Sequence, residues 1–391
     1  MKTKLVIFGI TGDLSTHKLL PALEHIISTG DFNDLSVVGV SRRQVELGEL
    51  LKDFASLQER TSIFVMDLAD TESYVRLKDS LALQEDEQAL MYLAVPPGAA
   101  AQIIDLIANA GLDIPNIKLL FEKPFGFDHA TAEDLIGRIA QNYSEDQVYR
   151  IDHYMAKEVA AEVIRLRTGA EKEHHSWNNQ SIKSVDIVAL ETLGVERRAN
   201  FYEQTGALRD VVQGHLLQLL SLVLMDIPDN FVMEDLPTYR LAALEHIKPV
   251  DPLKAVRAQY EDYQTEVNNI GSTTETFVSL LLESRDQNWQ GVPLHLTTGK
   301  ALSEKQTSIT IHYKDGTEDV FQEDTMPTKR LPGAYERVLI DAIDGRKSIF
   351  TTSAEILRAW EILAPVQEHW GMNMDDLAIY EKGSDLKDVI A

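Results

Sequence analysis

The sequence predicts a parallel, doubly wound α/β sheet over about residues 1–150, followed by a second domain of different order. Two observations predict the first domain. Short apolar segments of strand length alternate with stretches long enough for helices, and the first segment leads through a glycine turn into a helical pattern. A chain of 391 residues has room for two such domains, because domains usually span roughly 100–200 residues.

The first apolar segment, Leu5-Val6-Ile7-Phe8, has the length and composition of a strand that is buried on both faces. It ends at Gly9, and a helical pattern follows from about Lys18 to Ile27. A strand, a glycine turn and a helix form the unit that holds a pyrophosphate on helix N-terminal amides. The turn has the spacing G-x-x-G, so a tight turn without a ligand explains it equally well. The candidate coenzyme residues of this turn are Gly9, Thr11, Gly12, Asp13 and Leu14.

A second strand is predicted over Ser36–Val40, and it ends in Ser41-Arg42-Arg43. An acidic residue at this position would bind a ribose hydroxyl of NAD, whereas Arg42 and Arg43 suit the additional 2′-phosphate of NADP. The alternative is that both arginines are solvated at the start of a helix. Further strands are predicted at Ile63–Met66, Leu90–Val95 and Ile117–Phe121. Beyond about Glu171 the order changes: strands are predicted over Ile182–Glu191, Thr276–Leu282 and Ser308–Tyr313, and a long helix over Gly206–Met225.

Two of these strands end at prolines, which cannot continue a hydrogen-bonded ladder. The chain therefore leaves the sheet at Pro96, in Tyr92–Pro97, and again at Pro124, in Phe121–Gly126. Lys123, at the carboxyl end of its strand, points into the crevice where α/β sheets bind ligands. The alternative is an ordinary loop lysine.

Composition excludes several classes of function. The formal net charge is −25, which argues against a protein that binds nucleic acid or an anionic membrane. An anionic ligand would need a local basic pocket. The chain has no cysteine, so it has no disulfide, thiol nucleophile or cysteine-ligated metal, and no metal site is predicted. The apolar run at the amino terminus is too short for the core of a signal peptide. No later apolar run is expected to approach the length of a membrane-spanning helix. We therefore expect a cytoplasmic protein.

The segment Tyr149–Glu158 lies at the junction of the two predicted domains. If Asp152 caps a helix, His153 and Lys157 are four residues apart and share one face of it. An imidazole and an ammonium group near the positive amide end of a helix make a phosphate site. The alternative is a capped surface helix with incidental charges.

Several segments together resemble the glucose-6-phosphate dehydrogenase family, of which this chain resembles a shortened member. The resemblance implies a Rossmann-like NADP-binding domain over 1–150 and an α+β domain over 151–391. The second domain would contain a large, mainly antiparallel sheet that carries the subunit interface, so a homodimer or homotetramer is implied. Much of the missing length falls between Lys305 and Tyr335. The segments that carry the resemblance are Gly9–Leu23, Tyr92–Pro97, Glu122–Gly126, Arg150–Glu158, Gly206–Leu220, Ser272–Phe277 and Trp289–Leu302.

The resemblance implies that β-D-glucose 6-phosphate loses a hydride from its anomeric carbon to NADP and becomes 6-phospho-D-glucono-1,5-lactone. It assigns His215 as the general base, oriented by Asp152. A neutral imidazole suits this role because its pKa lies near working pH. The pattern around His215 is by itself more typical of a core residue, because Leu208, Val212 and Leu219 lie at helical offsets from it.

The resemblance also assigns the groups that hold the sugar phosphate. A dianionic phosphate needs several positive donors, and carboxylates can accept hydrogen bonds from sugar hydroxyls. The implied phosphate contacts are His153, Tyr154 and Lys157; the basic residues from the second domain are Lys300 and Lys305; the sugar carboxylates are Glu191 and Asp210; and Lys123 would touch both substrate and coenzyme.

Two other functions remain open at this point. The first is a dehydrogenase of a different sugar phosphate or of an unphosphorylated sugar, and NAD is a possible second coenzyme. The second is a non-catalytic NADP-binding sensor or assembly subunit. The presence of His215 and Asp152 argues against the sensor, and His153, Tyr154, Lys157 and Lys300 argue for a phosphorylated substrate.

Overall fold

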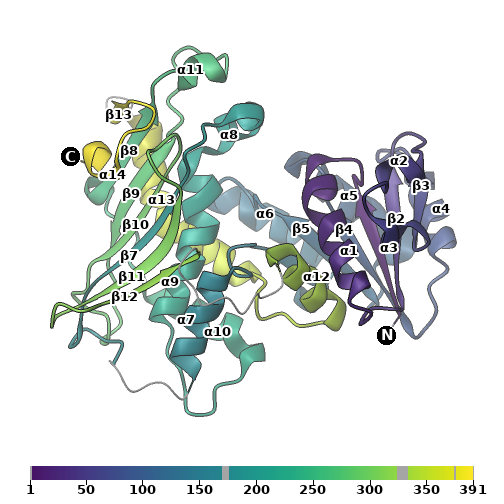
Figure 1. The fold of residues 1–391 in the computed structure, drawn as a ribbon, viewed down its shortest axis with the longest axis horizontal. Helices are drawn as coiled ribbons and strands as arrows, with labels where there is room; N and C mark the ends of the chain where they lie inside the picture. Colours follow the sequence, from purple (N-terminus) through teal and green to yellow (C-terminus); the bar gives the residue numbers. More distant parts are fainter. Residues whose placement is uncertain (1, 170–175, 324–332, 374–375, 391) are drawn as a thin grey trace. The chain divides into compact units, whose positions relative to one another are not determined.

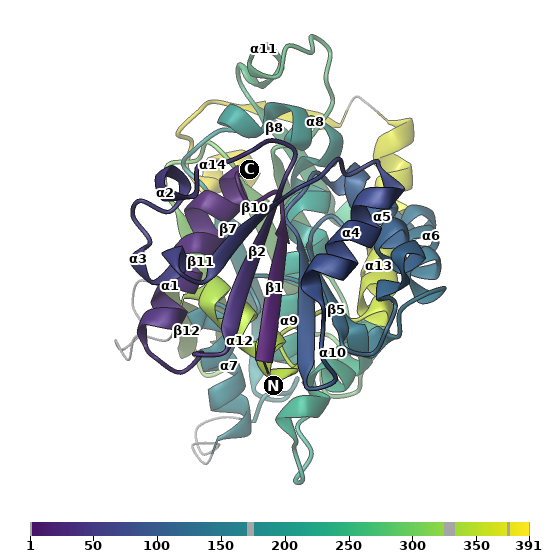
Figure 2. The same ribbon diagram turned by 90° about the vertical axis from the view of Figure 1, so that its right-hand side faces the viewer.

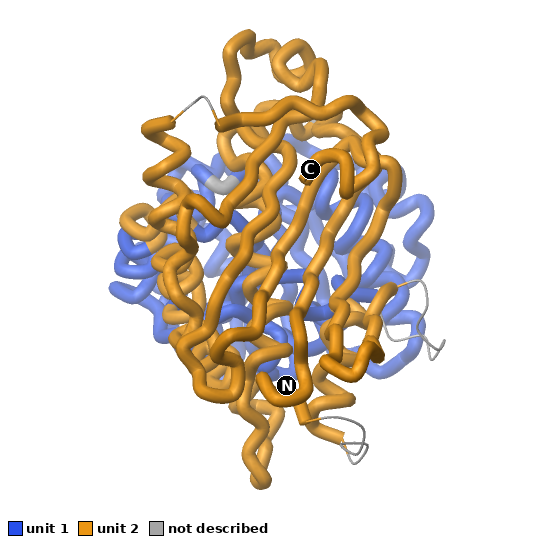
Figure 3. The backbone as a smooth tube through the Cα atoms, turned by 90° about the vertical axis from the view of Figure 1, so that its left-hand side faces the viewer, with its two compact units in different colours: residues 1–125, 133–156, 331–353 blue, residues 126–132, 157–330, 354–391 orange. Residues whose placement is uncertain are grey.

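A computed structural model describes residues 2–169, 176–323, 333–373 and 376–390. The chain forms two compact units, and each collects segments that are distant in sequence (Figure 3). Unit 1 consists of residues 1–125, 133–156 and 331–353, and unit 2 consists of residues 126–132, 157–330 and 354–391. The domain boundary after residue 150 stays a prediction.

Unit 1 is built on a parallel six-stranded sheet in the order β3-β2-β1-β4-β5-β6. The predicted doubly wound sheet is therefore confirmed. The chain builds outward from β1 through β2 to β3 and then returns to add β4 on the other side of β1. Figure 2 shows β2 and β5 on opposite sides of β1. Ligands bind where the strand order reverses, so the crevice is expected at the carboxyl ends of β1 and β4. The strands are β1 (Lys2–Phe8), β2 (Leu35–Ser41), β3 (Thr61–Val65), β4 (Glu87–Leu93), β5 (Ile117–Glu122) and β6 (Val148–Ile151).

Helices alternate with these strands, and β4 is buried along its whole length, as expected for a parallel sheet covered on both faces. Residues 333–353 return to unit 1, where Thr351 N donates to the carbonyl of Arg150 at the end of β6 (3.1 Å). The helical segments are η1 (Ser15–Leu19), α1 (Leu20–Ser28), α2 (Leu47–Leu50), α3 (Ala55–Gln58), α4 (Thr71–Leu81), α5 (Pro97–Ile107), η2 (Ala108–Leu112), α6 (His129–Ala140), η3 (Glu145–Gln147) and α12 (Ala334–Asp344).

Unit 2 contains a seven-stranded sheet in the order β12-β11-β7-β10-β9-β8-β13. Its neighbouring strands are antiparallel except for the pairs β7–β10 and β8–β13. The expected large, mainly antiparallel sheet is therefore confirmed. The strands are β7 (Ile182–Leu190), β8 (Ala255–Tyr260), β9 (Phe277–Leu282), β10 (Leu294–Gly299), β11 (Gln306–Tyr313), β12 (Glu318–Gln322) and β13 (Leu377–Tyr380).

The long helices of unit 2 lie on one face of this sheet (Figure 1). Alternate side chains of β7 and β11 are buried toward that face, and the described helices leave the central strands of the opposite face uncovered. The helical segments are α7 (Glu158–Thr168), η4 (Glu196–Arg198), α8 (Ala199–Ala207), η5 (Leu208–Leu216), α9 (Leu217–Leu224), η6 (Met233–Asp235), α10 (Leu236–His246), η7 (Pro252–Lys254), α11 (Tyr263–Glu266), α13 (Ser353–Met372) and α14 (Leu386–Ile390).

The helix predicted over Gly206–Met225 is part of a longer helical run, Ala199–Leu224. By length and composition this run could cross a membrane, so the expectation that no run approaches a span was wrong. Its most apolar window is 89% buried inside the structure, as in the core helix of a globular protein. Gly206 has φ +64° within the run, and a Cβ there would lie 2.4 Å from Glu275 Oε1.

Candidate active site

The glycine turn of unit 1 follows β1 and lies against the end of β4. Gly9 has φ +88°, and a Cβ at this position would lie 2.5 Å from the Ala94 carbonyl oxygen. The carbonyl of Gly9 accepts hydrogen bonds from Gly12 N and Ser15 Oγ, each at 2.9 Å. Only glycine fits this backbone, and its bare surface lets a ligand approach closely.

A cavity of about 840 Å³ lies at the carboxyl ends of the unit 1 strands. Its size falls within the range of small-molecule and cofactor pockets. Three predicted coenzyme residues, Asp13, Leu14 and Lys123, are not among those that line it. The other predicted coenzyme residues all line it: Gly9, Thr11, Gly12, Arg42, Arg43 and Pro96.

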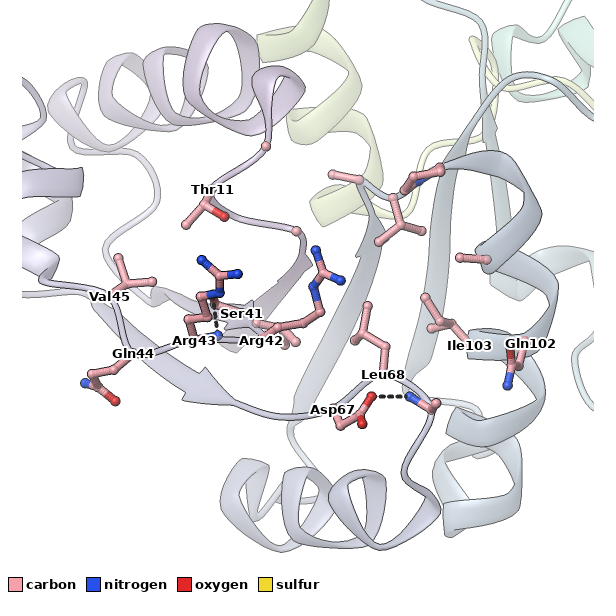
Figure 4. A pocket seen from close by; sticks show the side chains of 18 residues that line it. Thr11, Ser41, Arg42, Arg43, Gln44, Val45, Asp67, Leu68, Gln102 and Ile103 are labelled. Carbon is pink, nitrogen blue, oxygen red and sulfur yellow. Dashed lines mark hydrogen bonds between the residues drawn. The ribbon is translucent and has the colours of Figure 1, made fainter. Parts of the chain in front are cut away.

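Arg42 and Arg43 are exposed at the end of β2. Their side chains project into the cavity, toward the turn that carries Thr11 (Figure 4). The backbone there is held by a hydrogen bond from Arg43 N to Ser41 Oγ (3.3 Å). Two guanidinium groups in this position can bind a phosphate monoester, which is the feature that distinguishes NADP from NAD.

Sequence reasoning missed the contribution of the third strand and of α5 to this cavity. Asp67 and Leu68 follow β3, and Gln102 and Ile103 lie on α5; all four line the cavity. Asp67 Oδ1 accepts a hydrogen bond from Ala69 N (2.9 Å). The position of Asp67 after a predicted strand was the available signal, because carboxyl ends of parallel strands share one edge of the sheet.

Lys123 and Pro124 follow β5 and are joined by a cis peptide bond. Glu122, the last residue of β5, accepts a hydrogen bond from Tyr92 Oη at 2.7 Å. Burial raises the pKa of Glu122 to about 7, although hydrogen bonds from Tyr92 and Tyr335 and the charge of Lys123 oppose this shift. The charge of Asp152 raises the pKa of Glu122 further. Unit 1 therefore holds two carboxyl groups and a lysine close together at this edge.

Replacing Glu122 by Gln should change how stability depends on pH. The folded carboxyl keeps its proton up to about pH 7, whereas the unfolded one releases it above about pH 4.5. The wild type therefore loses stability as pH rises through this window, by up to about 1.4 kcal/mol per pH unit from this group. The neutral Gln has no such loss. Urea unfolding across the window should show that the free energy of unfolding of Glu122→Gln rises relative to that of the wild type as pH rises. The free energy of unfolding of the control variant Glu85→Gln, at an exposed residue, should follow the same pH dependence as that of the wild type. Parallel curves for Glu122→Gln would contradict the assignment.

Asp152 is 1% exposed, and its Oδ1 accepts a hydrogen bond from Tyr154 N (3.0 Å). It does not cap a helix, so that expectation was wrong. The chain forms successive turns instead, with Met155 N bonded to the Asp152 carbonyl (3.0 Å) and Ala156 N to that of His153 (3.2 Å). The aspartate side chain competes for the local backbone amide and favours this turn over a helix.

The predicted phosphate contacts are divided between the two units. His153 and Tyr154 belong to unit 1, where the His153 ring stacks on Tyr335 with centroids 6.1 Å apart. Lys157 belongs to unit 2 and is the N-cap of α7, which begins at Glu158. Lys157 Nζ lies 3.1 Å from Glu323 Oε1. The sequence had suggested that His153 and Lys157 share one face of a helix. They do not, because the helix begins only at Glu158.

Unit 2 brings Glu191 and Lys300 together. Each directly follows one of the parallel strands β7 and β10, which pair Leu190 with Gly299. Lys300 Nζ donates to Glu191 Oε2 at 2.5 Å, and Lys300 is only 5% exposed. Lys305 is exposed and precedes β11, whose Gln306 pairs with Leu190, so it lies at the same edge of the sheet. A buried ammonium beside a carboxylate can bind a phosphate and a hydroxyl together.

Tyr202 lies beside the pair Lys300 and Glu191, and it was not predicted from the sequence. Lys300 Nζ lies 5.3 Å from the centre of its ring, a cation–π contact that supports the ammonium group. Burial raises the pKa of Tyr202, and the charges of Asp210 and Glu191 add to this shift. The tyrosine therefore stays neutral near both predicted sugar carboxylates.

His215 and Asp210 lie on η5, a π-helical stretch of the kind that often occurs at functional sites. His215 is 5% exposed, and Arg198 Nη2 lies 3.5 Å from both carboxylate oxygens of Asp210. The start of η5 is held by Glu275, whose Oε1 accepts from Leu208 N at 2.9 Å. Burial raises the pKa of Glu275. This support could not be predicted from the sequence, because Glu275 is distant from η5 along the chain.

Comparison with known proteins identifies the family. A model described as "Glucose-6-phosphate dehydrogenase, NAD binding domain" matches residues 6–161, and one described as "Glucose-6-phosphate dehydrogenase, C-terminal domain" matches residues 164–331 and 322–388. The chain belongs to the glucose-6-phosphate dehydrogenase family. It is therefore an oxidoreductase, as the sequence resemblance implied.

Family relatives match the chain over nearly its whole length. The chain is 30% identical to glucose-6-phosphate 1-dehydrogenase of Chlamydia muridarum, over 94% of this chain and 90% of that protein. It is 31% identical to glucose-6-phosphate 1-dehydrogenase 1 of Mycobacterium tuberculosis, over 97% of this chain and 92% of that protein.

Solved structures of the family share the fold. The Mycobacterium avium glucose-6-phosphate 1-dehydrogenase matches with a TM-score of 0.87 and 30% identity, covering 98% of this chain and 94% of that one. A glucose-6-phosphate dehydrogenase in complex with its substrate glucose-6-phosphate matches with a TM-score of 0.89 and 26% identity, covering 100% of this chain and 96% of that one.

Proposed function

We propose that this protein oxidises β-D-glucose 6-phosphate to 6-phospho-D-glucono-1,5-lactone with NADP as hydride acceptor. One observation carries the proposal: the chain aligns along its whole length with a family member whose structure was solved in complex with its substrate glucose-6-phosphate. The coenzyme cavity with its arginine pair supports the same conclusion from the geometry of unit 1. The reaction is the oxidative step that the family name describes.

The coenzyme would be held by the cavity of unit 1. The backbone at Gly9 and Gly12 leaves room for a pyrophosphate, and Arg42 and Arg43 would bind the 2′-phosphate. Thr11 and Pro96 line the same cavity, and Asp13, Leu14 and Lys123 remain proposed contacts outside its lining. When bound, the nicotinamide ring accepts the hydride.

His215 is the proposed general base, and Asp152 the proposed residue that orients it. The anomeric hydroxyl must lose its proton as the hydride leaves, and a neutral imidazole can take that proton near neutral pH. A carboxylate on the second ring nitrogen would fix the tautomer and stabilise the imidazolium that forms. Both side chains are buried, at 5% and 1% exposure, which suits a water-excluding reaction site.

The substrate would be held by its charged end and by its hydroxyls. His153, Tyr154, Lys157 and Lys300 are the proposed phosphate contacts, with Lys305 and Lys123 as further cations. Two side chains are the proposed hydroxyl acceptors, Glu191 and Asp210. The ion pair between Lys300 and Glu191 supports this arrangement, because it places a cation and an acceptor side by side.

We also propose that the protein acts in the cytoplasm as a homodimer or homotetramer. The uncovered face of the unit 2 sheet supports self-association, because it exposes the apolar side chains of Val256 and Val320. Burial of such surface between two copies would be favourable. An acidic chain without cysteine is compatible with a reducing compartment.

The test is a spectrophotometric assay of NADP and NAD reduction with glucose 6-phosphate, glucose, and related hexose phosphates. We expect glucose 6-phosphate with NADP to give the highest kcat/KM of these combinations. Equal efficiency with glucose would contradict the phosphate contacts and indicate a dehydrogenase of unphosphorylated sugars. Coenzyme binding without reduction by any of the sugars would indicate a non-catalytic NADP-binding subunit.

A further inference from the structure

The uncovered face of the unit 2 sheet carries a row of alternating carboxylates and imidazoles, which we call the charge ladder: Glu318, His312, Asp186 and His295. They stand on four neighbouring strands, β12, β11, β7 and β10. His312 Nδ1 lies 2.7 Å from Glu318 Oε1, and its Nε2 lies 2.7 Å from Asp186 Oδ2. Asp186 Oδ1 lies 2.7 Å from His295 Nδ1. Hydrogen bonds therefore run without interruption across four of the seven strands.

The two contacts of His312 define its charge. Both partners are carboxylates, which only accept hydrogen bonds when ionised, and a neutral imidazole has a single N–H to donate. Satisfying Glu318 and Asp186 together requires the imidazolium form. Burial lowers the pKa of His312, but the hydrogen bonds and charges of the two carboxylates outweigh it, so the pKa is raised. Glu318, His312 and Asp186 therefore carry negative, positive and negative charge in that order.

Other charged groups near His312 are directed elsewhere. On β12, Asp319 accepts from Tyr313 Oη (2.6 Å), whose ring is buried toward the helix-covered face. Beyond the end of β11, Lys314 Nζ donates to the Asn179 carbonyl (2.6 Å), and Asp315 accepts from Thr317 within the turn. The residue opposite His312 on β7 is the neutral Ser184. Glu318 and Asp186 are thus the charges that set the state of His312.

The ladder lies on accessible surface. The side chains of His312 and His295 are 27% and 43% exposed, and Glu318 is 52% exposed. Val320 is 52% exposed, and its pairing with Thr310, two residues from His312, places it on the same face. A face that combines exposed apolar side chains with ordered charges has the composition of an interaction surface.

The alternating charges of the ladder are complementary to those of a second copy of the same chain. A two-fold axis that runs along the strands and passes between His312 and Asp186 reverses the order of the ladder, so Asp186 of each copy lies opposite the positive His312 of the other. We infer that the charge ladder is a specificity element of a contact between two copies of this chain, and that the contact weakens as His312 loses its proton. The inference rests on the self-association in the proposed function.

Loss of the proton reverses the effect of the ladder. With His312 neutral, Asp186 of one copy faces an uncharged ring, and the carboxylates of both copies repel one another without compensation. Each charge contact is repeated by the two-fold axis, so its effect on association is doubled. We expect the dissociation constant of the dimer to rise about tenfold between about pH 6 and about pH 9.

Sedimentation velocity of the full chain across this pH range tests the inference. His312→Gln should weaken association at low pH and remove its pH dependence, and His312→Arg should keep tight association at high pH. The matched control is His25→Gln, because His25 Nδ1 lies 2.8 Å from Glu336 Oε2 in unit 1. His25→Gln should leave the profile of the wild type unchanged. Thermal melting and NADP reduction should show that all variants are folded.

The outcomes separate the inference from the proposed function. The proposed role of the charge ladder is refuted if the dimer associates equally well at every pH. It is also refuted if His312→Arg and His312→Gln associate alike. Both results leave the proposed self-association intact. A monomer at every pH overturns both the ladder and the proposed oligomer. Neither result affects the proposed catalytic activity, which the sugar assay tests separately.

Discussion

Replacing His215 by Asn should lower kcat for glucose 6-phosphate about a thousandfold. General base catalysis contributes typically 10²–10⁴-fold, and Asn cannot take a proton from the anomeric hydroxyl. The groups proposed to hold the phosphate remain, so KM for the sugar should change little. A loss in kcat with KM unchanged is the signature of an interaction made only in the transition state. Steady-state kinetics and coenzyme titration of the purified variant check this.

The control is His246→Asn, which changes an exposed histidine at the end of α10 in the same unit. It should keep the activity of the wild type. His215 is buried, so the melting temperature of His215→Asn must be measured beside its activity. A folded His215→Asn that turns over as fast as the wild type would refute the assigned base.

Replacing Arg42 and Arg43 together by Ser should raise KM for NADP about a hundredfold and leave KM for NAD almost unchanged. Hydrogen bonds to charged groups are worth about 1.5–3 kcal/mol, and NAD lacks the 2′-phosphate that would receive them. The enzyme should thereby shift its preference toward NAD. Initial rates with both coenzymes at saturating glucose 6-phosphate measure the shift.

Arg76→Gln is the matched control for the arginine pair. Arg76 belongs to the same unit, is 57% exposed, and pairs with Asp70 across 3.6 Å on α4 rather than in the cavity. It should leave both KM values unchanged. An equal loss for NADP and NAD in the double variant would show that neither arginine recognises the 2′-phosphate.

The coenzyme half of the site was largely predictable from the sequence. Gly9, Gly12, Arg42 and Pro96 all lie in the turns that follow predicted strands, and parallel strands bring their carboxyl ends to one edge. Local pattern therefore determined spatial position. Asp67 follows the same rule and could have been included.

The second half of the site was less predictable, because long-range pairing creates it. Glu191 and Lys300 are 109 residues apart in sequence, and only the β7–β10 pairing brings them together. Four strands of unit 2 were not predicted from the sequence: β8, β10, β12 and β13. Their side chains follow no strict alternation, since both faces of β8 and β10 are largely buried near their carboxyl ends.

The error at Asp152 has a local cause. The segment from Asp152 to Lys157 has an N-cap residue and a polar first turn, which is typical of a helix start. The same aspartate oxygen also stabilises a turn by accepting from Tyr154 N, and the helix begins only at Glu158. Spacing within this segment consequently gave no valid information about which side chains share a face.

A crystal structure of the protein with glucose 6-phosphate, without coenzyme so that no turnover occurs, tests the central claim most directly. We predict that a ring nitrogen of His215 lies within about 3 Å of the anomeric oxygen, with Asp152 on the other nitrogen and the phosphate against His153, Tyr154 and Lys157. A sugar bound with its phosphate far from these three residues, or with its anomeric oxygen beyond reach of His215, would contradict the account.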